Sequence, residues 1–291
     1  MAKKPTPPPV TKKRAAWANA RGGATFKGKP LVPSAAPEER YRKRIEKAIR
    51  VMREETEREV AKLWAAHRPA VRSGMDASLA SQARILTNAL ARRFQAFFDK
   101  LAPGLADSFI SEVTKASAAG LHSSLKEMSG GISLKTSVID GTIKEMTKAS
   151  VAENVGLIKS IPREYFQRIQ GAVMRGITAG NGAAEVLETV KKSGAITDRR
   201  AELIARDQTS KATTHLNSAR MKSLGVQKFE WLHSGGGREP RPLHRNVLDG
   251  QVFSLDDPPV IDENTGERGL PGQLINCRCR MVPVVDFGTD E

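Results

Sequence analysis

The sequence predicts a mainly helical N-terminal region followed by a small α+β domain toward the C-terminal end. Apolar residues recur at helical spacing through the first two thirds of the chain, whereas alternating segments and glycine- and proline-rich turns dominate the last third. Aromatic residues make up only 5% of the chain, which argues against one large compact core. We therefore expect the amphipathic helices to form a bundle or a stalk. The predicted division is a disordered basic, proline-rich arm over 1–37, a helical region over 38–195 and the α+β domain over 196–288.

The arm contains no acidic residue and many prolines, glycines and alanines. Such a segment buries too little apolar surface to offset the entropy of ordering, so it is predicted to be disordered in isolation. We expect it to bind DNA or a partner protein, with a solubilising tail as the alternative. The candidate contact residues in the arm are Lys3, Lys4, Lys12, Lys13 and Arg14.

The helical region is predicted to consist of several helices separated by short breaks. Proline or glycine is expected to end them at Pro69, at Pro103, at 130–131 and at Gly194. The predicted helices cover 37–66, 77–101, 105–128, 132–152, 160–180 and 183–192.

The α+β domain is predicted to open with a helix that is capped near Thr197 or Asp198 and ends at Gly225. We expect this helix to present a polar face that carries Arg206, Gln208, Lys211 and Arg220. Strands are predicted over 228–233, 251–253 and 274–285, with a loop over 233–244 and a hairpin turn at Asp249-Gly250.

Two cysteines and two histidines of this domain are candidate metal ligands. Cys277 and Cys279 would share one face of a strand, because strand side chains alternate with period two, and they are too far apart in that geometry for a normal disulfide. With His233 and His244 they could form a Cys2His2 site for a structural zinc ion. The alternative is two buried free thiols and a histidine that is hydrogen-bonded in a turn.

The balance of charge favours an anionic partner. The chain has 47 Lys and Arg against 32 Asp and Glu, a formal net charge of +15. This excess suits nucleic acid or an acidic protein surface equally well. The candidate contact residues in the C-terminal region are Arg206, Arg241, Arg278 and Arg280, and the alternative is a solvated basic edge that prevents strand pairing.

Signatures of enzymes and of membrane proteins are missing from the sequence. Gly235-Gly236-Gly237 is not followed by the Lys and Ser or Thr of a phosphate-binding loop, and there is no Gly-x-Ser-x-Gly element. We could assemble no carboxylate cluster for metal-assisted hydrolysis. No apolar run reaches the length of a membrane span, and the first residues lack the apolar part of a signal peptide. The sequence therefore predicts a protein that is not an enzyme and does not enter a membrane.

Six motifs in order resemble the phage head morphogenesis domain, the Mu F-like minor capsid protein family, and the similarity begins near Asn154. The sequence departs from the family pattern in the turn after the tryptophan strand, where many relatives have an Asp and this chain has glycines at 235–237. A His before a Cys-Arg-Cys element recurs in the family, which favours zinc. The motifs are Ala-Arg-Asp-Gln-Thr-Ser-Lys at 205–211, Trp-Leu-His-Ser-Gly at 231–235, Arg-Pro-Leu-His-Arg at 241–245, Leu-Asp-Gly-Gln-Val-Phe at 248–253, Asp-Asp-Pro-Pro at 256–259 and Pro-Gly-Gln-Leu-Ile-Asn-Cys-Arg-Cys at 271–279.

The resemblance implies a minor capsid protein of a tailed phage that associates with the portal protein inside the procapsid and assists capsid assembly, DNA packaging or DNA delivery. Its expected partners are the portal protein, the major capsid or scaffold protein, and double-stranded phage DNA bound without sequence preference. Its expected location is the capsid interior near the portal, after a period in the host cytoplasm during assembly. The alternatives are a metal-dependent nuclease, an ADP-ribosyltransferase-like enzyme, and a free-standing DNA-binding regulator, which would show sequence preference.

Overall fold

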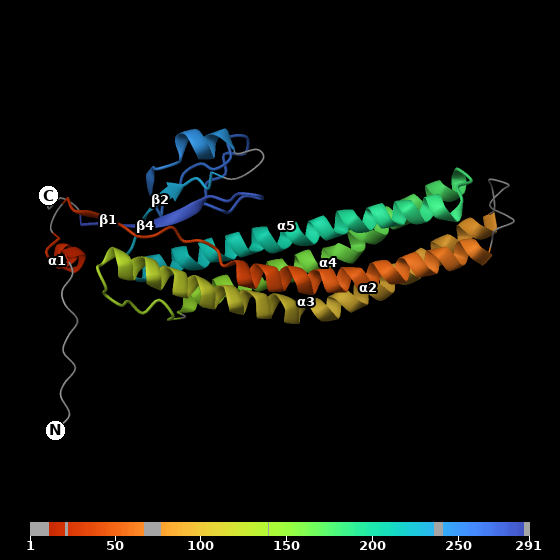
Figure 1. Ribbon diagram of the computed structural model, residues 1–291, viewed down its shortest axis with the longest axis horizontal. Coiled ribbons are helices and arrows are strands. Elements are labelled where there is room, and N and C mark those ends of the chain that lie inside the picture. Colours follow the sequence, from red (N-terminus) through yellow and green to blue (C-terminus); the bar gives the residue numbers. More distant parts are fainter. Residues whose placement is uncertain (1–11, 21–22, 67–76, 139, 236–240, 288–291) are drawn as a thin grey trace, which may run out of the picture. The chain divides into compact units, whose positions relative to one another are not determined.

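The structure is a computed structural model that describes residues 12–20, 23–66, 77–138, 140–235 and 241–287 (Figure 1). Long helices precede a small antiparallel sheet, so the predicted fold class is confirmed. The helices are α1 (Lys12–Ala18), α2 (Ala35–Ala66), α3 (Ala77–Met128), α4 (Gly141–Thr178) and α5 (Ala183–Ser223), and a short π-helix, η2, spans Leu243–Val247. The strands are β1 (Thr25–Lys27), β2 (Lys228–Leu232), β3 (Val252–Ser254) and β4 (Arg280–Asp286).

The chain forms two compact units that are each assembled from separate segments. Unit 1 comprises 1–34, 111–147 and 209–291, and unit 2 comprises 35–110 and 148–208. Helices α3, α4 and α5 contribute residues to both units. The units therefore do not follow the predicted boundaries after 37 and after 195, because each unit is built from contacts between segments that are distant in the sequence.

Two predicted helix breaks do not occur. Helix α3 continues through Pro103, and α4 continues across the predicted gap over 153–159 as well as through Pro162. A proline inside a helix removes one hydrogen bond and costs about 3 kcal/mol. Buried apolar residues on both sides of Pro103 offset this cost, namely Phe98, Ala102, Ala106 and Phe109.

Helix α5 likewise continues through the predicted break at Gly194. The hydroxyl of Thr197 donates to the carbonyl oxygen of Ser193 at 3.0 Å, so it bonds within the helix instead of capping a new one. Asp198 forms an ion pair with Arg53 of α2. A Cβ atom at position 194 would meet the end of the Arg53 side chain, so glycine leaves room for the ion pair between Arg53 and Asp198.

Helix α4 begins at Gly141, nine residues after the predicted start at 132. Asp140 caps it, since its Oδ1 atom accepts the backbone N–H of Ile143 at 2.9 Å. The segment before Asp140 is irregular and packs on α3, with the Thr136 hydroxyl donating to the carbonyl of Ala118 at 2.9 Å.

Unit 2 is built from the four long helices. Tyr41 near the start of α2 donates to Asn154 of α4 at 2.8 Å, and Trp64 near the end of α2 donates to the carbonyl of Asn181, just after α4. Helices α2 and α4 are therefore parallel in this unit. Asn154 also donates to Gln208 of α5 at 2.9 Å. Gln208 is consequently buried, although the sequence predicted it on a polar face.

Unit 1 contains an antiparallel four-stranded sheet in the order β1-β4-β2-β3. Burial of the side chains alternates along β2 as predicted, with Phe229 and Trp231 fully buried. Gly225 ends α5 with a φ of 77°, and Gly250 has a φ of 76° before the returning strand β3, as the sequence predicted. The core of the unit joins the sheet to α3 and α5 through Leu121, Leu125, Met128, Met221, Phe229, Trp231 and Met281.

The segment 1–37 is predicted to be disordered in isolation, and in the whole chain its described residues up to 34 pack on the sheet of unit 1. Strand β1 pairs with β4, and the N–H of Leu31 donates to the carbonyl of Met281 at 2.8 Å. The rings of Trp17, Phe26 and Phe287 contact one another edge to face, with centroids 5.2 to 5.8 Å apart. The segment is ordered because the open edge of β4 satisfies its backbone and its few apolar residues pack together. Residues 1–11 lie outside the described part of the chain.

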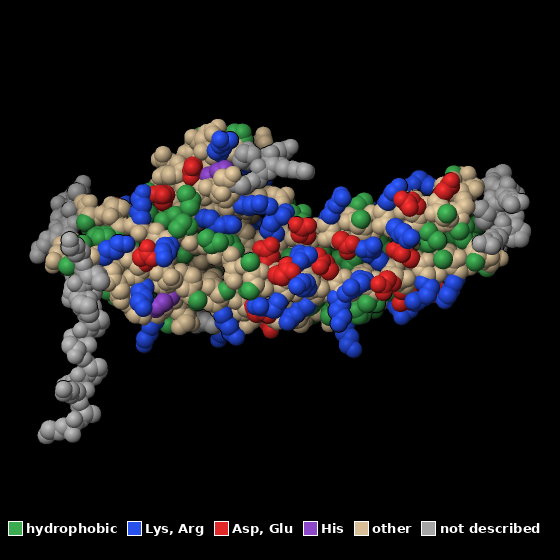
Figure 2. Space-filling view, viewed as in Figure 1, with side chains coloured by type: hydrophobic (Ala, Val, Ile, Leu, Met, Phe, Trp, Pro, Cys, Tyr) green, Lys and Arg blue, Asp and Glu red, His purple; other side chains and the backbone are tan. Residues whose placement is uncertain are grey.

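Charges of both signs cover the helices. Figure 2 shows Lys and Arg side chains along the helices of the face in view, with Asp and Glu among them. Several of these charges form ion pairs within one helix, such as Arg42 with Glu46 at 2.6 Å. Across the described ranges, none of the helices is both long and apolar enough to span a membrane.

Candidate metal centre

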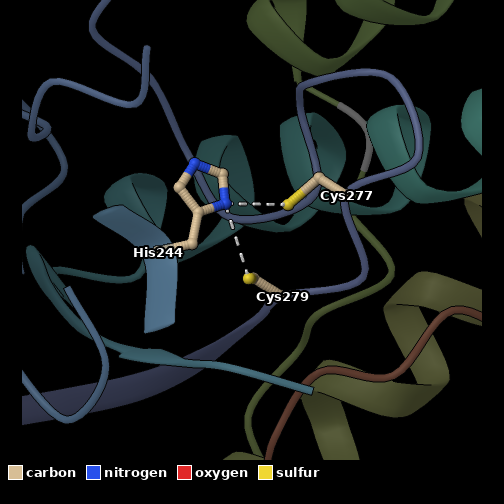
Figure 3. Close-up of side chains that lie close together, drawn as sticks. All are labelled: His244, Cys277 and Cys279. Carbon is tan, nitrogen blue, oxygen red and sulfur yellow. Dashed lines mark hydrogen bonds between the residues drawn. The ribbon is translucent and has the colours of Figure 1, made fainter. Parts of the chain in front are cut away.

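Three predicted metal ligands converge in unit 1. His244 lies in η2, and Cys277 and Cys279 lie in the irregular segment that leads into β4 (Figure 3). The prediction placed both cysteines on a strand, but β4 begins only at Arg280. The ligand atoms of the three side chains all lie within 4.8 Å of one another, and all three residues are buried. We call these three residues the His-Cys-Cys cluster.

The distances in the cluster suit a tetrahedral metal ion. The Nδ1 atom of His244 is 3.5 Å from the sulfur of Cys277 and 3.7 Å from the sulfur of Cys279. Zinc bonds of about 2.3 Å to sulfur and about 2.0 to 2.1 Å to nitrogen, at tetrahedral angles, separate the two ligand atoms by about 3.6 Å. The same distances also allow weak hydrogen bonds between thiol and imidazole.

The other ring nitrogen of His244 fixes the tautomer that a metal ligand needs. Its Nε2 atom lies 2.9 Å from the carbonyl oxygen of Ile261, and since a carbonyl only accepts, Nε2 carries the hydrogen. In a neutral ring Nδ1 then has a free lone pair, and this lone pair faces the two sulfur atoms (Figure 3). A backbone carbonyl behind a ligating histidine is a frequent outer contact in metal sites.

The local backbone holds the cysteines in place. Asn276 has a φ of 61°, an unusual left-handed conformation that asparagine tolerates, and the next N–H, of Cys277, donates to the carbonyl of Leu274 at 3.0 Å. Arg241, next to η2, donates to the carbonyl of Ile275 at 3.1 Å. The edge of the His244 ring meets the Trp231 ring, with centroids 4.9 Å apart. The turn at Asn276, the Arg241 guanidinium and the Trp231 ring thus position the cluster.

The two thiols do not ionise independently. The hydrogen bond from the Cys279 thiol lowers the pKa of Cys277 below its usual value. The interaction with Cys277 and burial raise the pKa of Cys279. The Cys277 thiol therefore ionises readily, and its negative charge disfavours ionisation of the Cys279 thiol. A divalent cation bound between them would offset this repulsion.

The donor set therefore fits zinc. Two thiolates and an imidazole are ligands that zinc prefers, and the three described residues supply three of the four positions of a tetrahedral site. Zinc bound there would connect η2 to the segment before β4 and so hold together two irregular parts of the unit. Cys277, Cys279 and His244 are the residues that would hold it.

His233 does not join the cluster. It follows β2, where its N–H donates to Asp249 at 2.7 Å and its Nδ1 accepts the N–H of Gly235 at 3.2 Å. The structure thus brings together three of the four predicted ligands. Within the described ranges, the residues grouped for metal binding are His244, Cys277 and Cys279.

The predicted basic contact residues that the structure describes are divided between the two units. Arg206 belongs to unit 2 and lies 3.8 Å from Glu202, whereas Arg241 and Arg280 contact the backbone around the cluster in unit 1. Arg278 is exposed. In the arm, Lys13 is exposed, Lys3 and Lys4 lie outside the described residues, and so do the side chains of Lys12 and Arg14.

Sequence reasoning missed one buried charge. Arg220 was predicted on a polar face of α5, but it is only 2% exposed. Its guanidinium donates to the Ser117 hydroxyl at 2.7 Å and to the carbonyl of Thr114 at 2.9 Å. Helical spacing gave no signal for this burial, because the partners come from α3.

Fold and site together define a helical protein whose C-terminal α+β part carries a buried His-Cys-Cys cluster. Residues 167–282 match the family described as phage Mu protein F like protein, and all three cluster residues lie inside this range. This part of the chain is therefore a phage Mu protein F-like domain, and the resemblance to the phage head morphogenesis family is confirmed.

A second comparison matches this chain well beyond residues 167–282. The chain is 31% identical over 264 residues to an uncharacterized protein of Haemophilus influenzae. The matched region covers 89% of this chain and 56% of the relative, so the chain spans a little more than half of that protein's length. No solved structure matches the chain.

Proposed function

We propose that the protein is a non-enzymatic minor capsid protein of a tailed phage that binds the portal protein inside the procapsid. In that position it would assist capsid assembly, DNA packaging or DNA delivery. The observation that carries this proposal is the match of residues 167–282 to the phage Mu protein F-like family. The protein would be located in the capsid interior near the portal, and in the host cytoplasm before assembly.

Within this proposal the His-Cys-Cys cluster has a structural role. A zinc ion at Cys277, Cys279 and His244 would fix the segment that presents the exposed Arg278. A rigid segment loses less conformational entropy when it docks on a partner. We therefore propose that unit 1 supplies the dock for the portal protein, and the major capsid or scaffold protein is a further candidate partner.

The net charge of +15 supports a second contact, with double-stranded phage DNA. This contact would be independent of sequence, because basic side chains bind phosphates and not base edges. Its affinity would fall steeply with salt, since each neutralised phosphate releases counterions. Docking on the portal and binding of DNA can therefore be separated by salt.

The test is co-purification of the full-length protein with its cognate portal protein at low and at high salt. We expect retention at both, with Arg278→Glu weakening it and Arg50→Glu leaving it unchanged. Arg50 is the matched control because it is exposed and belongs to unit 2, whereas the proposed dock belongs to unit 1. Absence of portal binding at both salt concentrations would overturn the portal assignment, and metal-dependent DNA cleavage by the purified protein would overturn the non-enzymatic one.

A further inference from the structure

Unit 1 also contains a pocket that is separate from the His-Cys-Cys cluster. Its volume is about 580 Å³, within the range of small-molecule sites. Helix α3, the irregular segment 133–137 and one residue of α5, Arg220, form its walls. All of these residues belong to unit 1.

Arg220 contributes a buried positive charge to this pocket. Its two hydrogen bonds, to Ser117 and to the Thr114 carbonyl, go to groups that carry no charge, and its Nε atom has no partner. Burial lowers the pKa of Arg220, and the Asp140 carboxylate opposes this effect through space. A buried cation with neutral partners is costly, and an anion beside it would recover part of that cost.

Further groups that can bind anions line the same pocket. Lys115 and Lys135 are exposed and line it, and His122 lines it with its Nδ1 atom 3.0 Å from the carbonyl oxygen of Leu134. The lining also contains the hydroxyl residues Ser133 and Ser137. Lysine, arginine and hydroxyl groups together are the donors that phosphate oxygens accept from in proteins.

The rest of the lining is apolar. Ala118, Ala119 and Leu134 contribute methyl and methylene groups to the wall. The volume is also far larger than a bare phosphate ion needs. A ligand that fills the pocket would therefore carry an anionic end and an apolar body.

We propose that this pocket binds a small phosphorylated ligand of about nucleotide size, with its phosphate between Arg220, Lys115 and Lys135 and its apolar part against Ala118 and Ala119. Phosphate fits this donor set better than a carboxylate does, because it carries more charge and offers three oxygens to several donors. The phosphate could belong to a free nucleotide or to the end of a nucleic acid strand, and the experiment distinguishes these sources.

The test is calorimetric titration of the full-length protein with adenosine 5′-monophosphate, adenosine and inorganic phosphate. We expect the monophosphate to bind at least roughly tenfold more tightly than either of the other two, since it alone supplies both the charge and the apolar body. A 5′-phosphorylated oligonucleotide that binds more tightly than the monophosphate would identify the strand end as the source. Binding of the monophosphate no tighter than adenosine would overturn the proposal.

Variants of exposed residues avoid loss of the fold. Lys135→Ala is expected to weaken binding of the monophosphate roughly threefold to tenfold, and Lys126→Ala is the matched control because Lys126 is exposed on α3 outside the pocket lining. Asp140→Asn keeps an α4 cap and removes the charge that offsets Arg220, so it is expected to tighten binding. Equal affinity of the two lysine variants would also overturn the proposal. Neither result affects the portal-binding test.

Discussion

The Nε2 atom of His244 lies 2.9 Å from the carbonyl oxygen of Ile261, and this bond turns the free nitrogen of the ring toward the cysteine sulfurs. Ile261 lies 17 residues after His244 in an irregular connection that begins at Asp256-Asp257-Pro258-Pro259. Through this hydrogen bond the long connection selects the tautomer of the buried His244.

The first prediction concerns metal content. Protein purified without chelators is expected to contain close to one zinc ion per chain by elemental analysis. Cys277→Ser, Cys279→Ser and His244→Ala are expected to lose it, because each removes a ligand from the cluster. His233→Ala is the control and is expected to retain the metal. Zinc-free wild-type protein that melts at the same temperature as protein loaded with zinc would contradict a structural site.

The cluster also shows which part of a site a sequence can specify. Two cysteines at i and i+2 and a preceding histidine were sufficient to nominate Cys277, Cys279 and His244. The spacing could not exclude His233, because the path of the loop after β2 decides where that ring lies. It bonds to Gly235, as part of a local turn.

The same distinction holds for the helices. Apolar periodicity indicates the helical region and its amphipathic faces, but the local breakers Pro103 and Gly194 do not end the helices that contain them. Tertiary contacts decided these positions, namely buried neighbours around Pro103 and the Arg53 side chain at Gly194. Arg220 became buried for a similar reason, since its acceptors lie on another helix.

The second prediction tests the N-terminal segment as part of unit 1. Leu31 is 6% exposed and its N–H pairs with Met281, whereas the neighbouring Val32 is 64% exposed. Leu31→Ala is expected to lower the free energy of unfolding by about 2 to 5 kcal/mol, because it leaves a cavity in the core. Val32→Ala is the control, with an expected change within about 0.5 kcal/mol. Equal effects in chemical denaturation would show that the segment does not pack on the sheet.

The third prediction separates two glycines inside helices. Nothing lies within 4 Å of a Cβ added at Gly156, whereas one added at Gly194 would lie 2.9 Å from the Cζ atom of Arg53. Gly156→Ala is expected to raise the free energy of unfolding by about 0.5 to 1 kcal/mol through reduced entropy of the unfolded chain. Gly194→Ala should gain less or lose stability, because it displaces Arg53 from Asp198. Equal gains in both variants would contradict the close approach of α2 and α5.

The last prediction concerns alkaline pH. The chain contains two tyrosines, Tyr41 and Tyr165, and burial raises the pKa of both above the usual value of 10.0. In the unfolded chain the phenols ionise near pH 10, while in the folded protein they stay neutral. The folded state then binds more protons than the unfolded state, so stability is full below about pH 10 and falls above it. The expected slope is about 1.4 kcal/mol per pH unit for each tyrosine.

The measurement is denaturant unfolding from pH 8 to pH 11, together with phenolate absorbance. Tyr41→Phe removes one hydrogen bond, to Asn154, and is therefore expected to lower stability at neutral pH by about 1 kcal/mol while reducing the loss above pH 10. Absorbance should rise together with unfolding and not before it, because the folded phenols do not ionise. Phenolate absorbance that titrates near pH 10 in protein that is still folded would contradict the burial of these rings in unit 2.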